Sequence, residues 1–248
     1  MKIAKDNWLS GVWGHDVFRI DVAASDQGAA LGDYVSQHIC EQKQAFYFTK
    51  IDTAQIEQVR TLSRTGLFVV DVNVTFQLDR VPVLSPPPFP VVVREVRDED
   101  AEAVLAIAGS AFRYSRFHLD PLVADELANR IKREWIANYV RKVRGDKLLV
   151  ALVNGKPVGF LAAIKAESHG QRLGIIDLIA VAGDQQKRRV GEALVMAFAE
   201  GYRPQCDLLQ VGTQVANAAA ARFYEKLGFS MKASQYVMHL HVRDGSPQ

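Results

Sequence analysis

The first third of the chain alternates apolar and polar positions in a way that predicts three strands and two helices. VFRIDVA (17–23) and AFYFTKI (45–51) are predicted strands, with a helical stretch at 28–44 between them. A second helix at 52–64 leads into LFVVDVNVTFQLD (67–79), where apolar residues recur with a period of two. These elements predict a small β-α-β-α-β unit.

A β-hairpin is the strongest local signal in the rest of the chain. In DKLLVALVNGKPVGFLAAIKA (146–166), Asn154-Gly155 separates two apolar runs, and this dipeptide favours a tight two-residue turn. The surrounding pattern predicts strands at 91–96, 174–181, 207–213 and near 235–242. It predicts helices at 98–112, at about 122–143 and at 217–227, and a further helix that follows the strand at 174–181 and ends at about 201.

A proline run divides these two sets of elements. VLSPPPFP contains three consecutive prolines, which lack N–H donors and fit neither a helix interior nor a central strand. We therefore expect a stiff linker at 83–90, a small N-terminal α/β domain at 1–82 and a larger domain at 91–248.

Composition places the chain among ordinary globular proteins. Its 248 residues are 48% hydrophobic and 23% charged, and the formal net charge of +2 favours neither nucleic acid nor a membrane surface as a partner. No apolar run is long enough for a signal peptide or a membrane helix, so a cytoplasmic location is expected. Cys40 and Cys206 are too far apart in sequence to suggest a disulfide framework or a zinc site.

The histidines show no metal-ligand spacing. His239 and His241 share one side of a predicted strand, but the sequence offers no third ligand beside them. The two histidines are therefore interpreted as incidental, and no metal is expected.

The segment QQKRRVGEAL (185–194) follows a buried strand and begins a helix. The first turn of a helix leaves backbone N–H groups without internal partners, and the helix dipole favours negative charge at this end. Arg188 and Arg189 lie beside that end, where basic side chains are unfavourable unless an anion arrives. The segment alone leaves two interpretations open, an anion site and a solvated charged face.

The segment TQVANAAAARFYEKLGF (213–229) predicts a second helix that carries candidate site residues. Asn217 is a candidate cap for a helix whose interior is mostly alanine, and Gly228 is a candidate C-terminal cap. Alone, this stretch is equally typical of an amphipathic helix with Tyr224 half-buried in the core.

Together the two stretches resemble the GNAT superfamily of N-acetyltransferases over residues from roughly 91 to 242. The order is a strand, a helix start with Gln-x-x-x-x-Gly, another strand, and then Asn-x-x-Ala followed by Phe-Tyr-Glu-Lys-Leu-Gly-Phe. The resemblance implies the GNAT fold: a mixed, largely antiparallel central sheet flanked by helices, here with the small N-terminal α/β domain added on the acceptor side. One position departs from the family pattern, because Arg189 stands where the family has glycine. A side chain there is tolerable if it points outward while the backbone N–H faces the ligand.

The resemblance also implies a cofactor, acetyl-coenzyme A, and a direct acyl transfer to an amine. Its pyrophosphate would lie on the backbone amides of Gln186, Lys187, Arg188, Arg189, Val190 and Gly191. Its pantetheine arm would pair with Ile179, Ala180 and Val181, and Asn217 would contact that arm. A backbone N–H near Val181 would stabilise the oxyanion, and Tyr224 would protonate the leaving sulfur.

A narrower resemblance concerns the acceptor. SAFRYSRF (110–117) and WIANYVR (135–141) resemble the bacterial acetyltransferases of dTDP-linked 4-amino-4,6-dideoxy sugars, the dTDP-fucosamine acetyltransferase subgroup, whose products enter surface-polysaccharide synthesis. This implies a nucleotide-sugar amine as acceptor. An acidic residue on the last strand of the N-terminal domain corresponds to Asp71, the candidate base, with a solvent-facing strand position as the alternative. Asp177 is the rival base, with a structural role as its alternative.

Arg116 and Phe117 are candidates for binding the acceptor, since a guanidinium suits a diphosphate and an aromatic ring suits a base. A surface ion pair and core packing are their respective alternatives. Two further functions stay open: a GNAT enzyme for another amine (a protein N-terminus, lysine, polyamine or antibiotic) and a non-catalytic acyl-CoA-binding module. The added N-terminal domain offers a surface for a homodimer.

Overall fold

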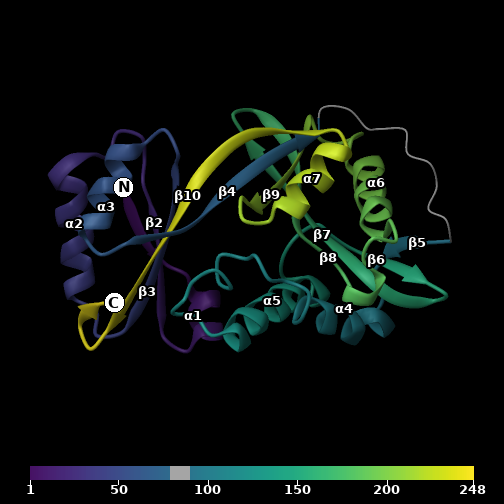
Figure 1. Ribbon diagram of the computed structural model, residues 1–248, viewed down its shortest axis with the longest axis horizontal. Coiled ribbons are helices and arrows are strands. Elements are labelled where there is room, and N and C mark those ends of the chain that lie inside the picture. Colours follow the sequence, from purple (N-terminus) through teal and green to yellow (C-terminus); the bar gives the residue numbers. More distant parts are fainter. Residues whose placement is uncertain (79–89) are drawn as a thin grey trace.

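One open sheet runs through the computed structural model, which describes residues 1–78 and 90–248 (Figure 1). Its strand order is β1-β2-β3-β10-β4-β9-β8-β7-β6-β5, with β11 added to β10. The strands are β1 (Lys2–Lys5), β2 (Asp16–Asp21), β3 (Ala45–Asp52), β4 (Phe68–Leu78), β5 (Val92–Glu95), β6 (Lys147–Val153), β7 (Lys156–Ser168), β8 (Gln171–Val181), β9 (Leu208–Gln214), β10 (Phe229–Arg243) and β11 (Ser246–Pro247). The pairs β2–β3 and β8–β9 are parallel and the other pairs are antiparallel, which confirms the predicted mixed, largely antiparallel sheet.

Helices cover both faces of this sheet. They are α1 (Asn7–Trp13), α2 (Gly28–Cys40), α3 (Ile56–Arg64), α4 (Ala101–Ala108), α5 (Asp125–Val140), α6 (Val190–Tyr202) and α7 (Ala218–Lys226), with short 3-10 turns η1 (Asp98–Asp100) and η2 (Gly183–Gln185). The helices α2, α3, α6 and α7 pack on one face, and α1, α4 and α5 pack on the other, along the lower side of Figure 1. Among the described residues no helix is long and apolar enough to cross a membrane.

The strand β10 joins the two parts of the sheet. Its second half, Gln235–Val242, pairs with β3, and Phe229–His239 pairs with β4. The strand β4, which precedes the proline run in sequence, pairs on its other edge with β9. The N-terminal part of the chain therefore supplies a central strand to the C-terminal part. The predicted linker at 83–90 lies outside the described residues except for Pro90.

Most predicted elements are present, and the hairpin turn is as expected. Asn154 and Gly155 have φ angles of 51° and 74°, the left-handed conformation that this two-residue turn requires. The last strand begins at Phe229 rather than near Gln235, because a bulge around Lys232 breaks the period of two that sequence reasoning relies on. The helix predicted to reach Phe112 ends at Ala108.

The short elements β1 and α1 escaped prediction, although a cap signal for α1 is present. Asp6 accepts a hydrogen bond from the Leu9 amide through its side chain at 2.9 Å, as an N-cap residue does. Leu9 and Trp13 are buried by this helix against the sheet. The helix thereby closes the end of the sheet face on which α5 also lies.

Candidate active site

The two central parallel strands, β8 and β9, separate after a short pairing. Their register runs only from Leu173–Leu208 to Ile176–Val211, yet β8 continues to Val181 and β9 to Gln214. A bulge in β8 marks the separation, because Ala162 pairs with Leu178 and Ala163 with Ile176, so that Asp177 has no partner across β7. The residues beyond this bulge keep a backbone edge that faces the gap. An extended chain can add to such an edge.

The end of β8 leads directly to the start of α6. The helix begins at Val190, and its N-cap residue, Arg189, provides no side-chain cap. No cap from the N-cap side chain therefore covers the amides of the first turn, at the end that favours an anion. The Gln186 side-chain nitrogen Nε2 donates to the Val181 carbonyl at 3.3 Å, which holds the connecting loop against β8.

The backbone at Arg189 has a conformation that favours glycine, the residue expected at this position from the family resemblance. Its φ is 62° and its ψ is 12°, in the left-handed region that glycine occupies without cost. Its Nε donates to Glu192 at 2.6 Å, and the other oxygen of Glu192 accepts from Lys226 at 2.7 Å. The side chain is thus tied to a carboxylate of α6 that also holds α7. Its backbone keeps the conformation of the expected glycine.

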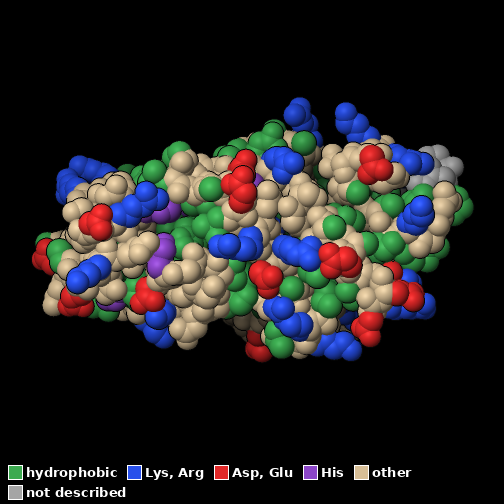
Figure 2. Space-filling model, turned by 90° about the horizontal axis from the view of Figure 1, so that it is seen from below, with side chains coloured by type: hydrophobic (Ala, Val, Ile, Leu, Met, Phe, Trp, Pro, Cys, Tyr) green, Lys and Arg blue, Asp and Glu red, His purple; other side chains and the backbone are tan. Residues whose placement is uncertain are grey.

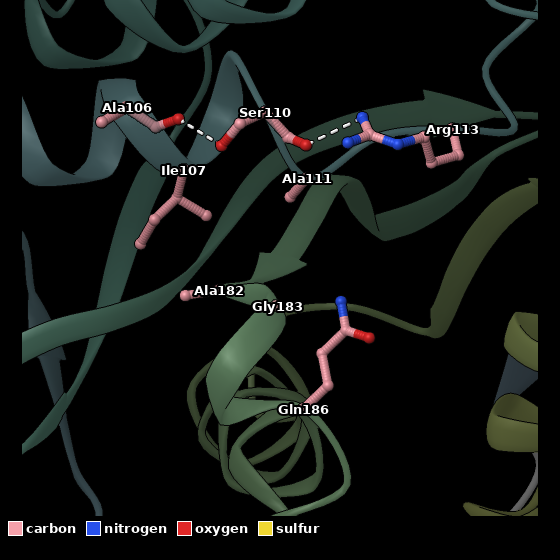
Figure 3. Close-up of a pocket in the computed structure, with 8 residues that line it drawn as sticks. All are labelled: Ala106, Ile107, Ser110, Ala111, Arg113, Ala182, Gly183 and Gln186. Carbon is pink, nitrogen blue, oxygen red and sulfur yellow. Dashed lines mark hydrogen bonds between the residues drawn. The ribbon is translucent and has the colours of Figure 1, made fainter.

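A cavity of about 330 Å³ lies beside this loop (Figure 3). Gln186, Ala182 and Gly183 line it from the connection between β8 and α6, while the end of α4 and the following loop line it from the opposite side. The Arg113 guanidinium donates to the Ser110 carbonyl at 2.9 Å and stabilises that loop. The cavity therefore opens next to the residues expected to hold a pyrophosphate.

Tyr224 lies on the α6 and α7 side of the gap. It is 4% exposed, and its ring contacts Phe76, Phe223 and Phe229 at centroid distances of 6.0, 5.3 and 5.6 Å. Burial raises the pKa of its hydroxyl far above the ordinary tyrosine value. The hydroxyl therefore stays protonated at neutral pH and can donate a proton or a hydrogen bond. Asn217 caps the same helix, because its Oδ1 accepts from the Ala220 amide at 3.1 Å.

Asp71 lies on the opposite face of the sheet, on β4. It is 8% exposed, so the solvent-facing alternative does not hold. Its Oδ2 is the one enclosed side-chain polar atom without a hydrogen-bond partner among residues 1–78 and 90–248. Desolvation raises the pKa of this carboxyl, and the backbone amides of Val72 and Ala216 only partly offset that rise. An unpaired buried carboxylate is unfavourable, so a ligand group is a natural partner.

Asp177 has the opposite environment. Its carboxylate accepts from Tyr139 at 2.6 Å, from Trp135 at 2.8 Å and from Arg144 at 3.0 Å. Burial raises its pKa, but these hydrogen bonds and the charge of Arg144 hold the pKa below the ordinary value. Asp177 thus joins the bulge of β8 to α5, and both its oxygens accept hydrogen bonds.

Arg116 and Phe117 lie in the connection between α4 and α5, and the structure separates their roles. Phe117 is 1% exposed and belongs to the core with Trp13 and Phe46, so core packing describes it. The Arg116 guanidinium carbon lies 3.9 Å from the Phe48 ring centroid and 4.4 Å from that of Phe117. Two aromatic faces therefore hold Arg116 rather than a surface ion pair.

His239 and His241 are not incidental, because Asp120 supplies the third group that sequence reasoning missed. Its Oδ2 lies 2.7 Å from His239 Nδ1 and 2.8 Å from His241 Nε2, and all three side chains are buried. These three atoms lie close enough together to share a metal ion. Their separations are those of hydrogen bonds, so hydrogen bonding accounts for the group.

This buried group reaches Arg116. Burial lowers the pKa of His239 to about 4, so its ring is neutral at pH 7 and donates its Nδ1–H to the Asp120 carboxylate. The other nitrogen, Nε2, is then an acceptor and lies 3.5 Å from Arg116 Nη1. Because Asp120 comes from a loop 119 residues before His239, no local sequence signal could reveal the pair.

Comparison with known proteins agrees with this geometry. The family model "Acetyltransferase (GNAT) family" matches residues 104–229. The spore coat polysaccharide biosynthesis protein SpsD of Bacillus subtilis is 31% identical over 142 residues, which are 57% of this chain and 47% of that protein, so the chain matches about half of that relative's length. A dTDP-fucosamine acetyltransferase of Escherichia coli is 25% identical over 77% of this chain and 79% of its own.

A solved structure shares the fold at low sequence identity. The GCN5-related N-acetyltransferase from Sphaerobacter thermophilus superposes with a TM-score of 0.60 at 18% identity, covering 94% of this chain and 75% of that one. The separated strands, the helix start beside them and the family match over half of the sequence lead to one assignment. This chain belongs to the GNAT family of N-acetyltransferases.

Proposed function

We propose that this enzyme transfers the acetyl group of acetyl-CoA to the amine of a nucleotide-linked amino sugar of the dTDP-4-amino-4,6-dideoxyhexose type. The observation that carries the proposal is the extent of the similarity to dTDP-fucosamine acetyltransferase. That match spans 191 residues, more than the 158 of segment 91–248, so it extends into the N-terminal part that forms one wall of the site. The name of SpsD, a spore coat polysaccharide biosynthesis protein, supports a role in polysaccharide synthesis.

The residues beside the gap fit acetyl-CoA. The backbone amides from Gln186 to Gly191 would hold the pyrophosphate at the start of α6, where the N-cap residue provides no side-chain cap. The edge of Ile179–Val181 would pair with the pantetheine arm, because β9 does not pair with β8 at this level. Asn217 uses its oxygen as a helix cap, which leaves its amide nitrogen for a contact with the arm. The cofactor supplies an activated acetyl group and a thiol leaving group.

The two candidate proton-transfer groups lie on opposite faces of the sheet. Tyr224 projects from α7 onto the sheet face that carries Phe76 of β4, whereas Asp71 projects to the other face of the same strand. We assign Tyr224 as the acid that protonates the leaving sulfur and Asp71 as the base that accepts the proton of the attacking amine. The cofactor and the acceptor would then enter from opposite faces and meet in the gap between β8 and β9.

Asp71 is a better candidate for the base than Asp177. The pKa of Asp71 is raised, so its carboxylate takes up a proton more readily at neutral pH, and one of its oxygens is without a partner. The pKa of Asp177 is lowered, and Tyr139, Trp135 and Arg144 occupy its carboxylate. We assign Asp177 a structural role, the attachment of α5 to the bulge of β8.

A thiol-release assay across a panel of amines tests the proposal. The panel contains dTDP-4-amino-4,6-dideoxyhexoses, a peptide with free N-terminus and lysine, a polyamine and an aminoglycoside, each with acetyl-CoA. We expect kcat/KM for a nucleotide sugar to exceed that for the other amines by at least about a hundredfold, since binding of the distant nucleotide contributes to the rate. A higher kcat/KM for any other amine would assign that acceptor instead. Acetyl-CoA binding with no thiol release from any amine would indicate a non-catalytic module.

A further inference from the structure

Three basic side chains converge on the sheet face that carries Asp71. Lys50 belongs to β3, Arg116 to the connection between α4 and α5, and Lys132 to α5. Desolvation is the main cause that lowers the pKa of both lysines, and the charge of Arg116 lowers each further, against an opposing effect of Asp177. The charge of Lys50 also lowers the pKa of Lys132. Elements distant in sequence therefore bring three positive charges close together.

Aromatic rings hold two of these cations, Arg116 and Lys132, without neutralising them. Arg116 lies over Phe48. Lys50 is two residues further along β3 than Phe48, so Phe48 and Lys50 project from the same face of the strand. Lys132 Nζ lies 5.1 Å from the Phe112 ring centroid and 5.3 Å from that of Trp135. Cation–π contacts of this kind orient a charge and leave it available to an anion.

Carboxylates that could pair with these lysines are engaged elsewhere. Within the described chain, Lys50 and Lys132 make neither an ion pair nor a hydrogen bond through their side chains. Asp177 is bound to Arg144, and Asp120 is bound to the two histidines of β10. Desolvation and repulsion from Arg116 lower the pKa of each lysine to about 8, so each is mostly charged at pH 7. Such a cluster is unfavourable without an anion.

The cluster is local. Seen from below (Figure 2), basic side chains are interspersed with acidic and apolar ones, and no broad patch of one charge covers the visible described surface. A polyanion such as nucleic acid requires an extended basic surface, whereas one compact anion requires a few convergent cations. The arrangement therefore favours a small phosphorylated ligand.

The strand register places this cluster beside the candidate base. Lys50 pairs with Val237 of β10, and Val237 pairs with Asp71 of β4. Directly opposed residues of antiparallel strands project to the same face, so Lys50 and Asp71 share that face about 10 Å apart, two strand spacings. In a nucleoside diphosphate linked to a 4-amino sugar, the amine and the diphosphate lie at opposite ends of the sugar ring.

We propose that Lys50, Arg116 and Lys132 form the binding site for the diphosphate of the acceptor, with its amine directed toward Asp71. This inference rests on the proposed function, because it assumes a nucleoside diphosphate as part of the acceptor. A planar guanidinium and two ammonium groups match the oxygens of a diphosphate. The Phe48 and Phe117 rings both contact the guanidinium, and His239 contacts its Nη1.

Equilibrium binding of dTDP to the full chain tests the site without requiring turnover. Lys50→Met and Lys132→Met remove one charge each, and methionine retains the packing of the Lys132 stem against Phe112 and Trp135. We expect each variant to weaken dTDP binding by about tenfold or more, the loss of one charge-assisted contact. Acetyl-CoA binding stays unchanged, and thymidine, which lacks phosphates, binds each variant as it binds the parent. Lys50→Arg, which keeps the charge at an exposed position, retains dTDP binding.

Lys165→Met is the matched control, since Lys165 contacts Gln205 and Asp146 on another part of the surface. Unchanged dTDP binding in both Lys50→Met and Lys132→Met overturns the inference, and so does an equal loss of acetyl-CoA or thymidine binding. If the parent acetylates no nucleotide sugar but dTDP binding depends on the lysines, the proposed function fails and the phosphate site stands. If the parent acetylates the sugar with a KM that both variants leave unchanged, the function stands and the site is wrong.

Discussion

At the scale of single residues, burial gives Tyr224 and Asp71 complementary properties. Removal from water raises the pKa of both groups, because it disfavours the charged form of each. For the tyrosine this preserves a proton to donate, and for the carboxylate it increases the affinity for a proton. The same physical effect thus suits Tyr224 to the proposed role of acid and Asp71 to the proposed role of base, on the two faces of the sheet.

Tyr224→Phe tests the acid. The ring keeps its contacts with Phe76, Phe223 and Phe229, so the fold and acetyl-CoA binding should stay unchanged. We expect kcat to fall by about 10²–10⁴-fold, the usual contribution of general acid catalysis. Steady-state kinetics and calorimetric titration with acetyl-CoA measure the two quantities. Turnover equal to that of the parent would exclude Tyr224 as the acid.

Asp71→Asn tests the base through activity and stability together. The folded-state pKa of Asp71 is raised, so the folded protein holds this proton at pH values where the unfolded chain has lost it, and stability falls as pH rises through that range. The amide removes this loss. At pH 8 we expect Tm to rise by about 2–4 °C, corresponding to about 1 kcal/mol, with a smaller gain near pH 4. At neutral pH kcat should fall by about 10²-fold.

Asp177→Asn should change Tm at pH 8 in the opposite direction to Asp71→Asn. Because the pKa of Asp177 is lowered, its stabilising contribution is present above the unfolded-state pKa and is lost only in acid. The substitution weakens the contacts with Arg144, Trp135 and Tyr139, so Tm should fall at pH 8. Thermal unfolding of both variants at pH 4 and pH 8 measures the contrast. A fall of Tm in Asp71→Asn at pH 8 would contradict the unpaired state of that carboxylate.

Single residues also show where sequence reasoning stops. Asp71 and Tyr224 could be selected from local motifs, since each lies within a recognisable strand or helix. Lys50, Lys132 and Asp120 could not, because their significance depends on β3, α5 and a loop that meet only after folding. Arg189 adopts the left-handed conformation, which sequence reasoning predicts only where a glycine is present.

At the scale of elements, the functional feature is the separation of β8 from β9. Sequence periodicity predicted both strands and the helix after β8, because each has a continuous apolar pattern. It could not predict where their pairing ends, because the bulge at Asp177 changes the register by a single residue without altering composition. The gap that defines the site is therefore a property of the assembled sheet.

Close packing of α6 against α7 fixes the position of the helix that carries Tyr224. A Cβ at Gly191 would lie 3.2 Å from the Phe223 ring, whereas a Cβ at Gly201, on the same helix, would meet nothing within 4 Å. We expect Gly191→Val to displace α7, to lower Tm by several degrees and to raise the KM for acetyl-CoA about tenfold. Gly201→Val should leave Tm and KM near the parent values. Equal effects of the two substitutions in thermal unfolding and kinetics would contradict this role of the α6–α7 contact.

At the scale of the whole molecule, one strand from before the proline run completes the sheet after it. β4 lies between β9 and β10, and its side chains Val74, Phe76 and Leu78 belong to the same core as Tyr224 and α6. The sequence predicted β4 as a strand and the proline run as a boundary. It could not predict that β4 crosses that boundary, because strand pairing between distant segments leaves no local signal.

This arrangement predicts that the two parts of the chain do not fold independently. A fragment of residues 91–248 would leave the edges of β9 and β10 that normally pair with β4 unpaired, and would expose the core residues that β4 covers. We expect this fragment to lack cooperative thermal unfolding and to bind no acetyl-CoA. The full chain should instead unfold in one transition by both near-ultraviolet and far-ultraviolet circular dichroism. Adding a peptide that covers residues 68–78 should restore part of the acetyl-CoA binding, because the missing strand pairs in trans. A fragment that folds cooperatively and binds acetyl-CoA without β4 would show that the C-terminal part is a self-sufficient domain.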